Sequence, residues 1–201
     1  MNSTKNLKND HVTIRRVKNM AKKCSDILYS NGHVPIEDIE IISVIMEEFV
    51  DRFHHGKEEN AYFPETKSKD NYSEDIRKFL IEHELGRRIA MMLRRELKKY
   101  KENIRNNDGQ LKGYHDTNPV VNSEPIARFL KSYAVFIDDH TAKEDKFFDL
   151  VEANNSISTY EDKMLIKHYE ICKKEVGGDV RIQEMYRLIE YIEEQGWMKS
   201  E

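Results

Sequence analysis

Hydrophobic side chains recur every three or four residues along four long stretches of the chain, a spacing that predicts amphipathic α-helices. We expect these helices over about residues 7–31, 35–64, 74–105 and 123–153. Glycine, proline and an Asn-Asn-Asp-Gly run lie between the stretches, where they favour chain reversals. Because the apolar positions alternate three- and four-residue steps, the helices are expected to pack side by side. The pattern therefore predicts an all-α protein with an up-down-up-down four-helix bundle.

The last part of the chain follows a different pattern. Ser158 and Glu161 have the spacing of a capping box, which predicts the start of a shorter helix. The glycine pair at 177–178 interrupts that helix, and Asp179 is expected to cap a last one. The expected division is 1–153 for the four-helix bundle and 154–201 for a two-helix C-terminal extension packed on it.

Composition narrows the class of protein. The 201 residues are 35% charged and 38% hydrophobic, as expected of helices that bury one face and expose the other. The net charge of −4 argues against nucleic-acid and membrane-surface partners, since both favour a basic face. No run approaches the ~18 apolar residues of a membrane span, and the polar N-terminus shows no secretory signal. Cys24 and Cys172 fall inside predicted helices, where reduced thiols are expected, so we expect a cytoplasmic protein.

Each of the four long helices carries a histidine on its hydrophobic face, and two helices add a glutamate four residues further on. The histidines are His11, His54, His83 and His140, and the glutamates are Glu58 and Glu144. Residues four apart lie on one helix face, one turn from each other. Because neighbouring helices run in opposite directions, histidines early in the odd helices and late in the even helices reach the same end of the bundle. Four imidazoles and two carboxylates are therefore expected in one layer.

A buried layer of this composition favours a metal site. A single histidine on an apolar face is usually a core residue, whereas two buried carboxylates are costly unless a cation compensates them. Imidazole nitrogen and carboxylate oxygen without thiolate suit iron, manganese or zinc. Six ligands exceed what one structural zinc needs, and two carboxylates that can each bridge suggest a two-metal centre. A ferritin-like site is not favoured, because no histidine has a glutamate three residues before it.

The segments that carry these residues are similar to a known family. The chain resembles the hemerythrin-like HHE cation-binding domain over about residues 10–149, in the segments DHVTIRRV, HHGKEENAYFP, EHELGRR and HTAKEDKFF. The resemblance implies a four-helix bundle that holds two iron ions joined by an oxide or hydroxide bridge. The implied iron ligands are His11, His54, Glu58, His83, His140 and Glu144, with the two glutamates as bridges.

One departure from the oxygen carriers of that family affects the expected function. The carriers use five histidines, two of them one turn apart on the third helix, whereas Phe79 and Arg87 flank His83 at that spacing. The four-histidine, two-glutamate set is similar to iron-centre repair proteins and to some bacterial hemerythrin-like proteins. It predicts a di-iron protein that reacts with peroxide, nitric oxide or oxygen, in stress defence or iron-centre repair. The alternative is a non-catalytic module that binds or senses oxygen, nitric oxide or iron.

Three residues near the predicted ligands have two interpretations each. His55 follows His54 about 100° around an α-helix, which predicts a surface or supporting residue. A shifted register would instead make His55 and Glu59 the ligands. Gly86 would either leave room for a small ligand or allow close helix packing. Arg87 is expected at the surface, or else would bring positive charge near a bound ligand.

The other histidines are not expected at the metal site. His168 falls on an apolar stripe of the C-terminal extension, which predicts a core position. His33 and His115 fall in loops and are expected to be solvated.

Overall fold

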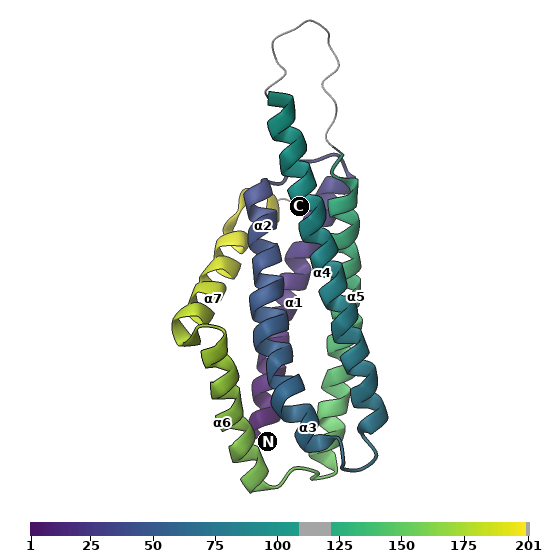
Figure 1. Ribbon diagram of the computed structural model, residues 1–201, viewed down its shortest axis with the longest axis vertical. Helices are drawn as coiled ribbons and strands as arrows, with labels where there is room; N and C mark the ends of the chain where they lie inside the picture. Colours follow the sequence, from purple (N-terminus) through teal and green to yellow (C-terminus); the bar gives the residue numbers. More distant parts are fainter. Residues whose placement is uncertain (109–121, 200–201) are drawn as a thin grey trace, which may run out of the picture.

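The four long helices run alternately up and down around a shared core, and the chain enters α1 and leaves α5 at the same end (Figure 1). This computed structural model describes residues 1–108 and 122–199. Its elements are α1 (Asn2–Tyr29), α2 (Ile36–Ile45), the π-helical segments η1 (Met46–His55) and η2 (Glu58–Tyr62), α3 (Phe63–Thr66), α4 (Ser73–Asp108), α5 (Glu124–Ala153), α6 (Thr159–Glu175), α7 (Gly178–Glu194) and α8 (Gly196–Lys199). The described residues contain helices and no strand, so the predicted all-α class is confirmed.

The second long helix, from α2 to α3, is not a regular α-helix. Its backbone follows the π-helical pattern, with hydrogen bonds between residues five apart, through η1 and again through η2. π-Helical segments are rare and are frequent at functional sites. Because each π turn holds more residues than the 3.6 of an α-helix, successive side chains are separated by less than 100°. Neighbouring residues of η1 can therefore point toward the same side.

Two helix ends differ from the prediction. α1 begins at Asn2 rather than Leu7, because the backbone N–H groups of Asn2 and Ser3 donate to the Asp162 carboxylate at 3.1 and 2.9 Å. The second helix was expected to end at Pro64 but continues to the end of α3. Pro64 lies in the first turn of α3, directly after the π-helical segment η2.

Buried apolar residues form two clusters with a polar layer between them. On α1, Leu7 belongs to one cluster and Ile14 to the other, and the buried His11 lies between them. On α5, Ile137 belongs to the cluster of Ile14, and Phe147 belongs to the cluster of Leu7. Apolar packing on both sides keeps bulk water away from the layer and strengthens electrostatic interactions inside it.

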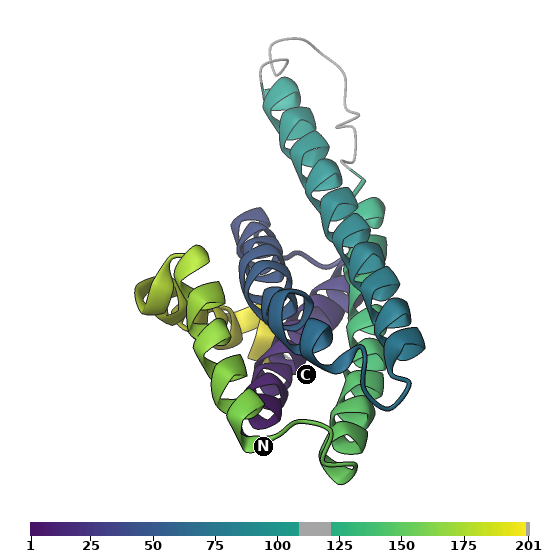
Figure 2. The ribbon, with the colours of Figure 1, turned by 60° about the horizontal axis from the view of Figure 1, so that its bottom comes forward.

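The C-terminal helices pack on the α1 and α2 side of the bundle, away from α4 and α5 (Figure 2). The predicted capping box is confirmed, since Ser158 Oγ accepts from the Glu161 backbone and Glu161 accepts from the Ser158 backbone. The helix expected after an Asp179 cap is α7, which begins at Gly178 because Gly177 reverses the chain with a φ of 105°. α7 adds four buried residues to the larger apolar cluster: Ile182, Met185, Ile189 and Ile192.

Three further expectations concern the whole chain. Within the described ranges, none of the helices combines the length and apolar content that a membrane crossing requires. Cys24 and Cys172 are both free and buried. Most of the polar connection expected between the third and fourth helices, including His115, lies outside the described residues.

Candidate metal centre

The structure brings all six predicted ligands to one level of the bundle. His11 comes from α1, His54 from η1, Glu58 from η2, His83 from α4, and His140 and Glu144 from α5. None of these residues is more than 1% exposed. Two histidine pairs face each other: the Nε2 atoms of His11 and His54 are 3.0 Å apart, and the ring centroids of His83 and His140 are 4.9 Å apart.

Each glutamate extends between the two histidine pairs. Glu58 Oε1 lies 3.4 Å from His54 Nε2, and its Oε2 lies 3.4 Å from His83 Nε2. Glu144 Oε2 lies 3.4 Å from His11 Nε2 and 3.2 Å from His140 Nε2, and its Oε1 lies 3.3 Å from His83 Nε2. A carboxylate whose two oxygens face different sets of donors has the geometry to bridge two ions.

A second set of carboxylates, called the outer carboxylates below, forms a closed ring around the bundle. In this ring a carboxylate of each long helix contacts the Nδ1 atom of the histidine on the next helix. The contacts are Asp145–His11 at 2.8 Å, Asp10–His54 at 3.1 Å, Glu59–His83 at 2.7 Å and Glu82–His140 at 2.9 Å. Sequence reasoning missed these four carboxylates. Each is the immediate neighbour of a predicted ligand in the sequence, and that adjacency was the available signal.

The carboxylates of this ring influence which nitrogen of each histidine carries the proton. Burial raises the pKa of Asp10, although the adjacent Lys57 ammonium favours its charged form. The hydrogen bond from His140, with a second from Lys143, lowers the pKa of Glu82 to about 2. Burial opposes ionisation of Asp145, but hydrogen bonds from His11 and an arginine still hold its pKa below the ordinary value. An ionised carboxylate can only accept, so the Nδ1–H donates and Nε2 keeps its lone pair. In metal sites, outer carboxylates orient ligating histidines in this way.

The separation of the first histidine pair fits a shared metal ion. With Nδ1 protonated on both rings, the Nε2 lone pairs of His11 and His54 face each other across 3.0 Å. Burial lowers the pKa of both imidazoles, which disfavours a shared proton between them. Two nitrogens that each lie ~2.1 Å from one metal ion at right angles would be about 3 Å apart. A cation therefore relieves a repulsion that the fold otherwise imposes.

Several polar atoms of the layer have no hydrogen-bond partner. They include both carboxylate oxygens of Glu58, Oε2 of Glu144 and Nε2 of His140. Each buried unsatisfied group costs about 1–3 kcal/mol. Burial raises the pKa of both glutamates well above the ordinary value, so the layer resists charge until a cation is present. These nitrogen and oxygen donors fit a centre of two metal ions, and they suit iron, manganese or zinc.

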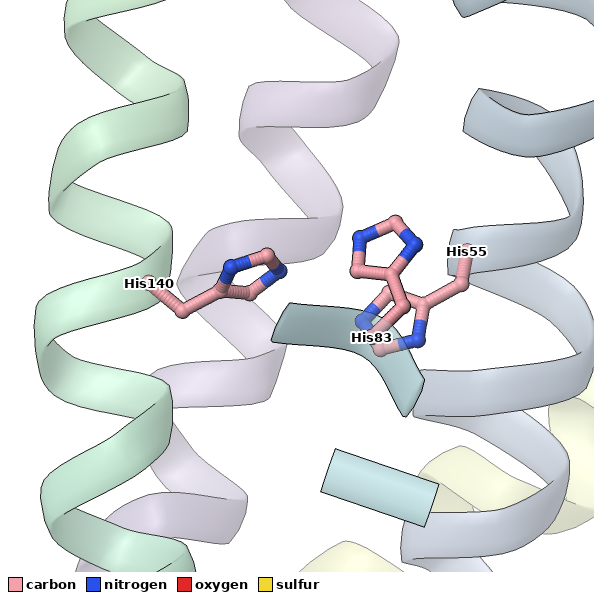
Figure 3. A group of neighbouring side chains, drawn as sticks. All are labelled: His55, His83 and His140. Atoms are coloured by element: carbon pink, nitrogen blue, oxygen red, sulfur yellow. The ribbon is translucent and has the colours of Figure 1, made fainter. Parts of the chain in front are cut away.

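His55 lies in the same layer, which the sequence did not predict. Its side chain is buried, and its ring stacks on the His83 ring with centroids 3.8 Å apart (Figure 3). The expected surface position is wrong, because the π-helical turn of η1 brings both His54 and His55 inward. A shifted register does not replace the predicted pair, because His54 and Glu58 stay in the layer, whereas Glu59 accepts from His83 Nδ1.

A buried lysine supports the ring of carboxylates. The Lys57 ammonium donates to Asn6 Oδ1 at 2.7 Å and contacts Asp10, the carboxylate bonded to His54. The ring of Tyr169 on α6 lies 5.4 Å from the ammonium and helps to bury it. In the sequence Lys57 resembles a solvent-facing residue, whereas in the fold the rings of Phe53 and Tyr169 cover its ammonium.

A partly open cavity of about 240 Å³ reaches His55 between η1 and α4. Its lining includes Asp51, His55, Gly86, Arg87, Tyr133 and Phe136. A Cβ on Gly86 would lie 2.6 Å from the Phe136 ring, which stacks on His140. Gly86 therefore serves close packing of α4 on α5, the second of its two expected roles, and also borders the cavity.

Arg87 is half-buried, with 34% of its side chain exposed. Its guanidinium donates to Asp51 and to Glu59, each at 2.7 Å. The same Glu59 oxygen accepts from His83 Nδ1. Arg87 therefore holds the carboxylate that orients His83.

The other two histidines that the structure describes, His33 and His168, lie away from the layer. His33 is exposed, as predicted. His168 is also exposed, so its predicted core position is wrong. The buried stripe of α6 passes through Leu165, Tyr169 and Cys172 instead, one residue away from His168.

Removing one carboxylate of the ring should weaken metal binding without unfolding the bundle. Glu82→Ala leaves His140 Nδ1 without its acceptor, and we expect metal affinity to fall by about 10–100-fold. Glu82→Gln, which can still accept, should recover part of that loss. The exposed Glu84→Ala on the same helix is the matched control. Metal-competition titrations measure the affinities, and equal affinity in the Glu82 and Glu84 variants would contradict the orienting role.

Comparison with known proteins agrees with this geometry. The family model of the Hemerythrin HHE cation binding domain matches residues 2–151. No match was found among curated proteins or among solved structures. The matched residues include all six predicted ligands and the four carboxylates behind the histidines, which the structure gathers into one buried layer. The predicted resemblance is confirmed, and the chain belongs to the Hemerythrin HHE cation binding domain family, whose members are metal-binding modules.

Proposed function

We propose that this chain is a non-haem di-iron protein that reacts with peroxide, nitric oxide or oxygen. Its role would lie in defence against oxidative or nitrosative stress or in repair of iron centres. The observation that carries the proposal is the pairing of buried histidines, each oriented by an outer carboxylate, with two glutamates that span the pairs. The buried free thiols of Cys24 and Cys172 support a reducing, cytoplasmic location.

In this proposal each histidine pair would bind one metal ion. His11 and His54 would hold one ion, His83 and His140 the other, and Glu58 and Glu144 would bridge them. Two adjacent iron ions would supply one-electron redox chemistry and open coordination positions for a small ligand. The outer carboxylates keep each imidazole proton on Nδ1, so that Nε2 stays available. The two apolar clusters exclude bulk water and larger substrates.

The reactivity of the reduced, iron-loaded protein tests this proposal. We expect rapid oxidation by oxygen without a long-lived adduct, and turnover of peroxide or nitric oxide, because four histidines and two glutamates leave positions open on both ions. Stopped-flow absorption spectra after mixing with oxygen provide the measurement. Metal-free protein under the same conditions is the control for reactions that do not involve the centre.

The alternative is a module that binds or senses oxygen, nitric oxide or iron without turnover. The near-complete burial of the layer is compatible with both functions, because each requires only a very small ligand to reach the layer. A stable and fully reversible oxygen complex, with no consumption of peroxide or nitric oxide, would decide for this alternative and against the redox protein.

A further inference from the structure

His55 is a buried histidine without a hydrogen-bond partner on either ring nitrogen. Its residue is only 3% exposed, and the partly open cavity is the route by which water could approach the ring. A buried imidazole with two unsatisfied nitrogens costs free energy that a hydrophobic residue at this position would not. A purely structural role for His55 does not explain that cost.

The surroundings of His55 repeat the arrangement of the other four histidines in a looser form. Each of those has a carboxylate on Nδ1 and directs Nε2 into the layer. His55 Nδ1 lies 3.5 Å from Asp51 Oδ1, one turn earlier on the same helix. Its other nitrogen is left for the layer, where His55, His83 and His140 each place a possible ligand atom within 4.8 Å of the others.

We propose that His55 is a fifth imidazole ligand, which joins His83 and His140 on one of the two ions. The proposal rests on the di-iron centre proposed above and specifies its ligand set. The fifth imidazole would come from the second helix, directly beside His54, rather than from the third helix where Phe79 and Arg87 flank His83. The π-helical turn makes this possible, because a regular α-helix would direct His54 and His55 about 100° apart.

Metal binding would require His55 to leave its stack on His83. The two rings are nearly parallel, with 11° between their planes, and two parallel stacked imidazoles cannot both direct an in-plane lone pair at one ion. The cavity beside His55 gives its ring room to turn.

The fifth imidazole changes the number of positions open to small ligands. With six positions on each ion, five histidines, two bridging glutamates and one further bridge leave about one position free, on the ion of His11 and His54. His55 is also the least firmly held of the five, since its Nδ1 contact to Asp51 is the longest. In the resting centre it would therefore close one ion, and a reacting ligand could displace it.

Azide titration of the oxidised, iron-loaded full chain tests this ligand set. We expect the wild type to bind about one tight equivalent of azide and His55→Ala about two, because removing His55 opens the second ion. Added imidazole should occupy the space left in His55→Ala and return it to about one equivalent. His55→Phe keeps the stack on His83 but has no donor, so it should bind about two equivalents without rescue by imidazole. His33→Ala, at an exposed histidine, should match the wild type.

The outcomes separate this inference from the di-iron centre itself. Loss of one ion from the folded His55 variants, with rescue of His55→Ala by imidazole, would also support His55 as a ligand. Wild type and both His55 variants with the same iron content and the same azide stoichiometry would overturn it while leaving the centre intact. A wild type that takes up no iron would instead overturn the centre and the inference together.

Discussion

Replacing Glu144 with glutamine is expected to strip most of the iron from the purified protein. The substitution keeps the size of the side chain but removes the charge that would balance two cations in a buried layer. Both carboxylate oxygens of Glu144 face histidine Nε2 atoms, so the variant loses a contact to each ion. We expect iron content to fall from about two ions per chain to below about 0.5, measured by elemental analysis after anaerobic loading.

The matched control for this substitution is Glu124→Gln, which places the same change at the exposed start of the same helix. Its iron content should equal that of the wild type. Circular dichroism checks that both variants keep their helices. A Glu144→Gln variant that is folded and still holds its full iron would exclude Glu144 as a bridging ligand.

A second large effect is expected for Glu58→Met on the free energy of unfolding. Relative to the wild type, the variant should be more stable without metal and less stable with iron. Neither oxygen of this buried carboxyl has a hydrogen-bond partner, and its desolvation costs about 1–3 kcal/mol. Glu58→Met has a similar size and no unsatisfied polar atom, so it should raise the free energy of unfolding of the metal-free protein by about 1–3 kcal/mol. In the presence of iron the variant should gain no further stability, whereas the wild type should gain through binding.

Urea unfolding with chelator and with iron measures both effects. Glu37→Met, at an exposed position near the start of α2, controls for the chemistry of the substitution and should behave as the wild type. If Glu58→Met destabilised the metal-free protein, the carboxyl would have a stabilising partner and the layer would not depend on a cation.

The six predicted ligands could be placed from the sequence because helical periodicity sets both the buried face and the depth along the bundle. His11 and His54 meet at 3.0 Å because their helices run in opposite directions, as the pattern implied. The position of His55 could not be predicted in this way. The argument assumed a regular α-helix, and hydrogen bonding in η1 follows the π-helical pattern.

The outer carboxylates were missed for a different reason. Glu59 and Asp145 lie on the flanks of their helices, where their side chains remain 24% and 27% exposed. Charged residues at such positions usually face solvent, and only the neighbouring helix reveals the histidine that each one contacts. Lys57 and His168 could not be placed from the sequence for the same reason. The packing of α6 on the bundle covers Lys57 and leaves His168 exposed.

Mössbauer spectroscopy of the protein loaded with isotopically enriched iron tests the central claim most directly. A centre bridged by Glu58 and Glu144 predicts about two irons per chain, with all of the ferric signal from a magnetically coupled pair. A spectrum dominated by isolated, uncoupled ferric ions, or about one iron per chain at saturation, would contradict the di-iron centre.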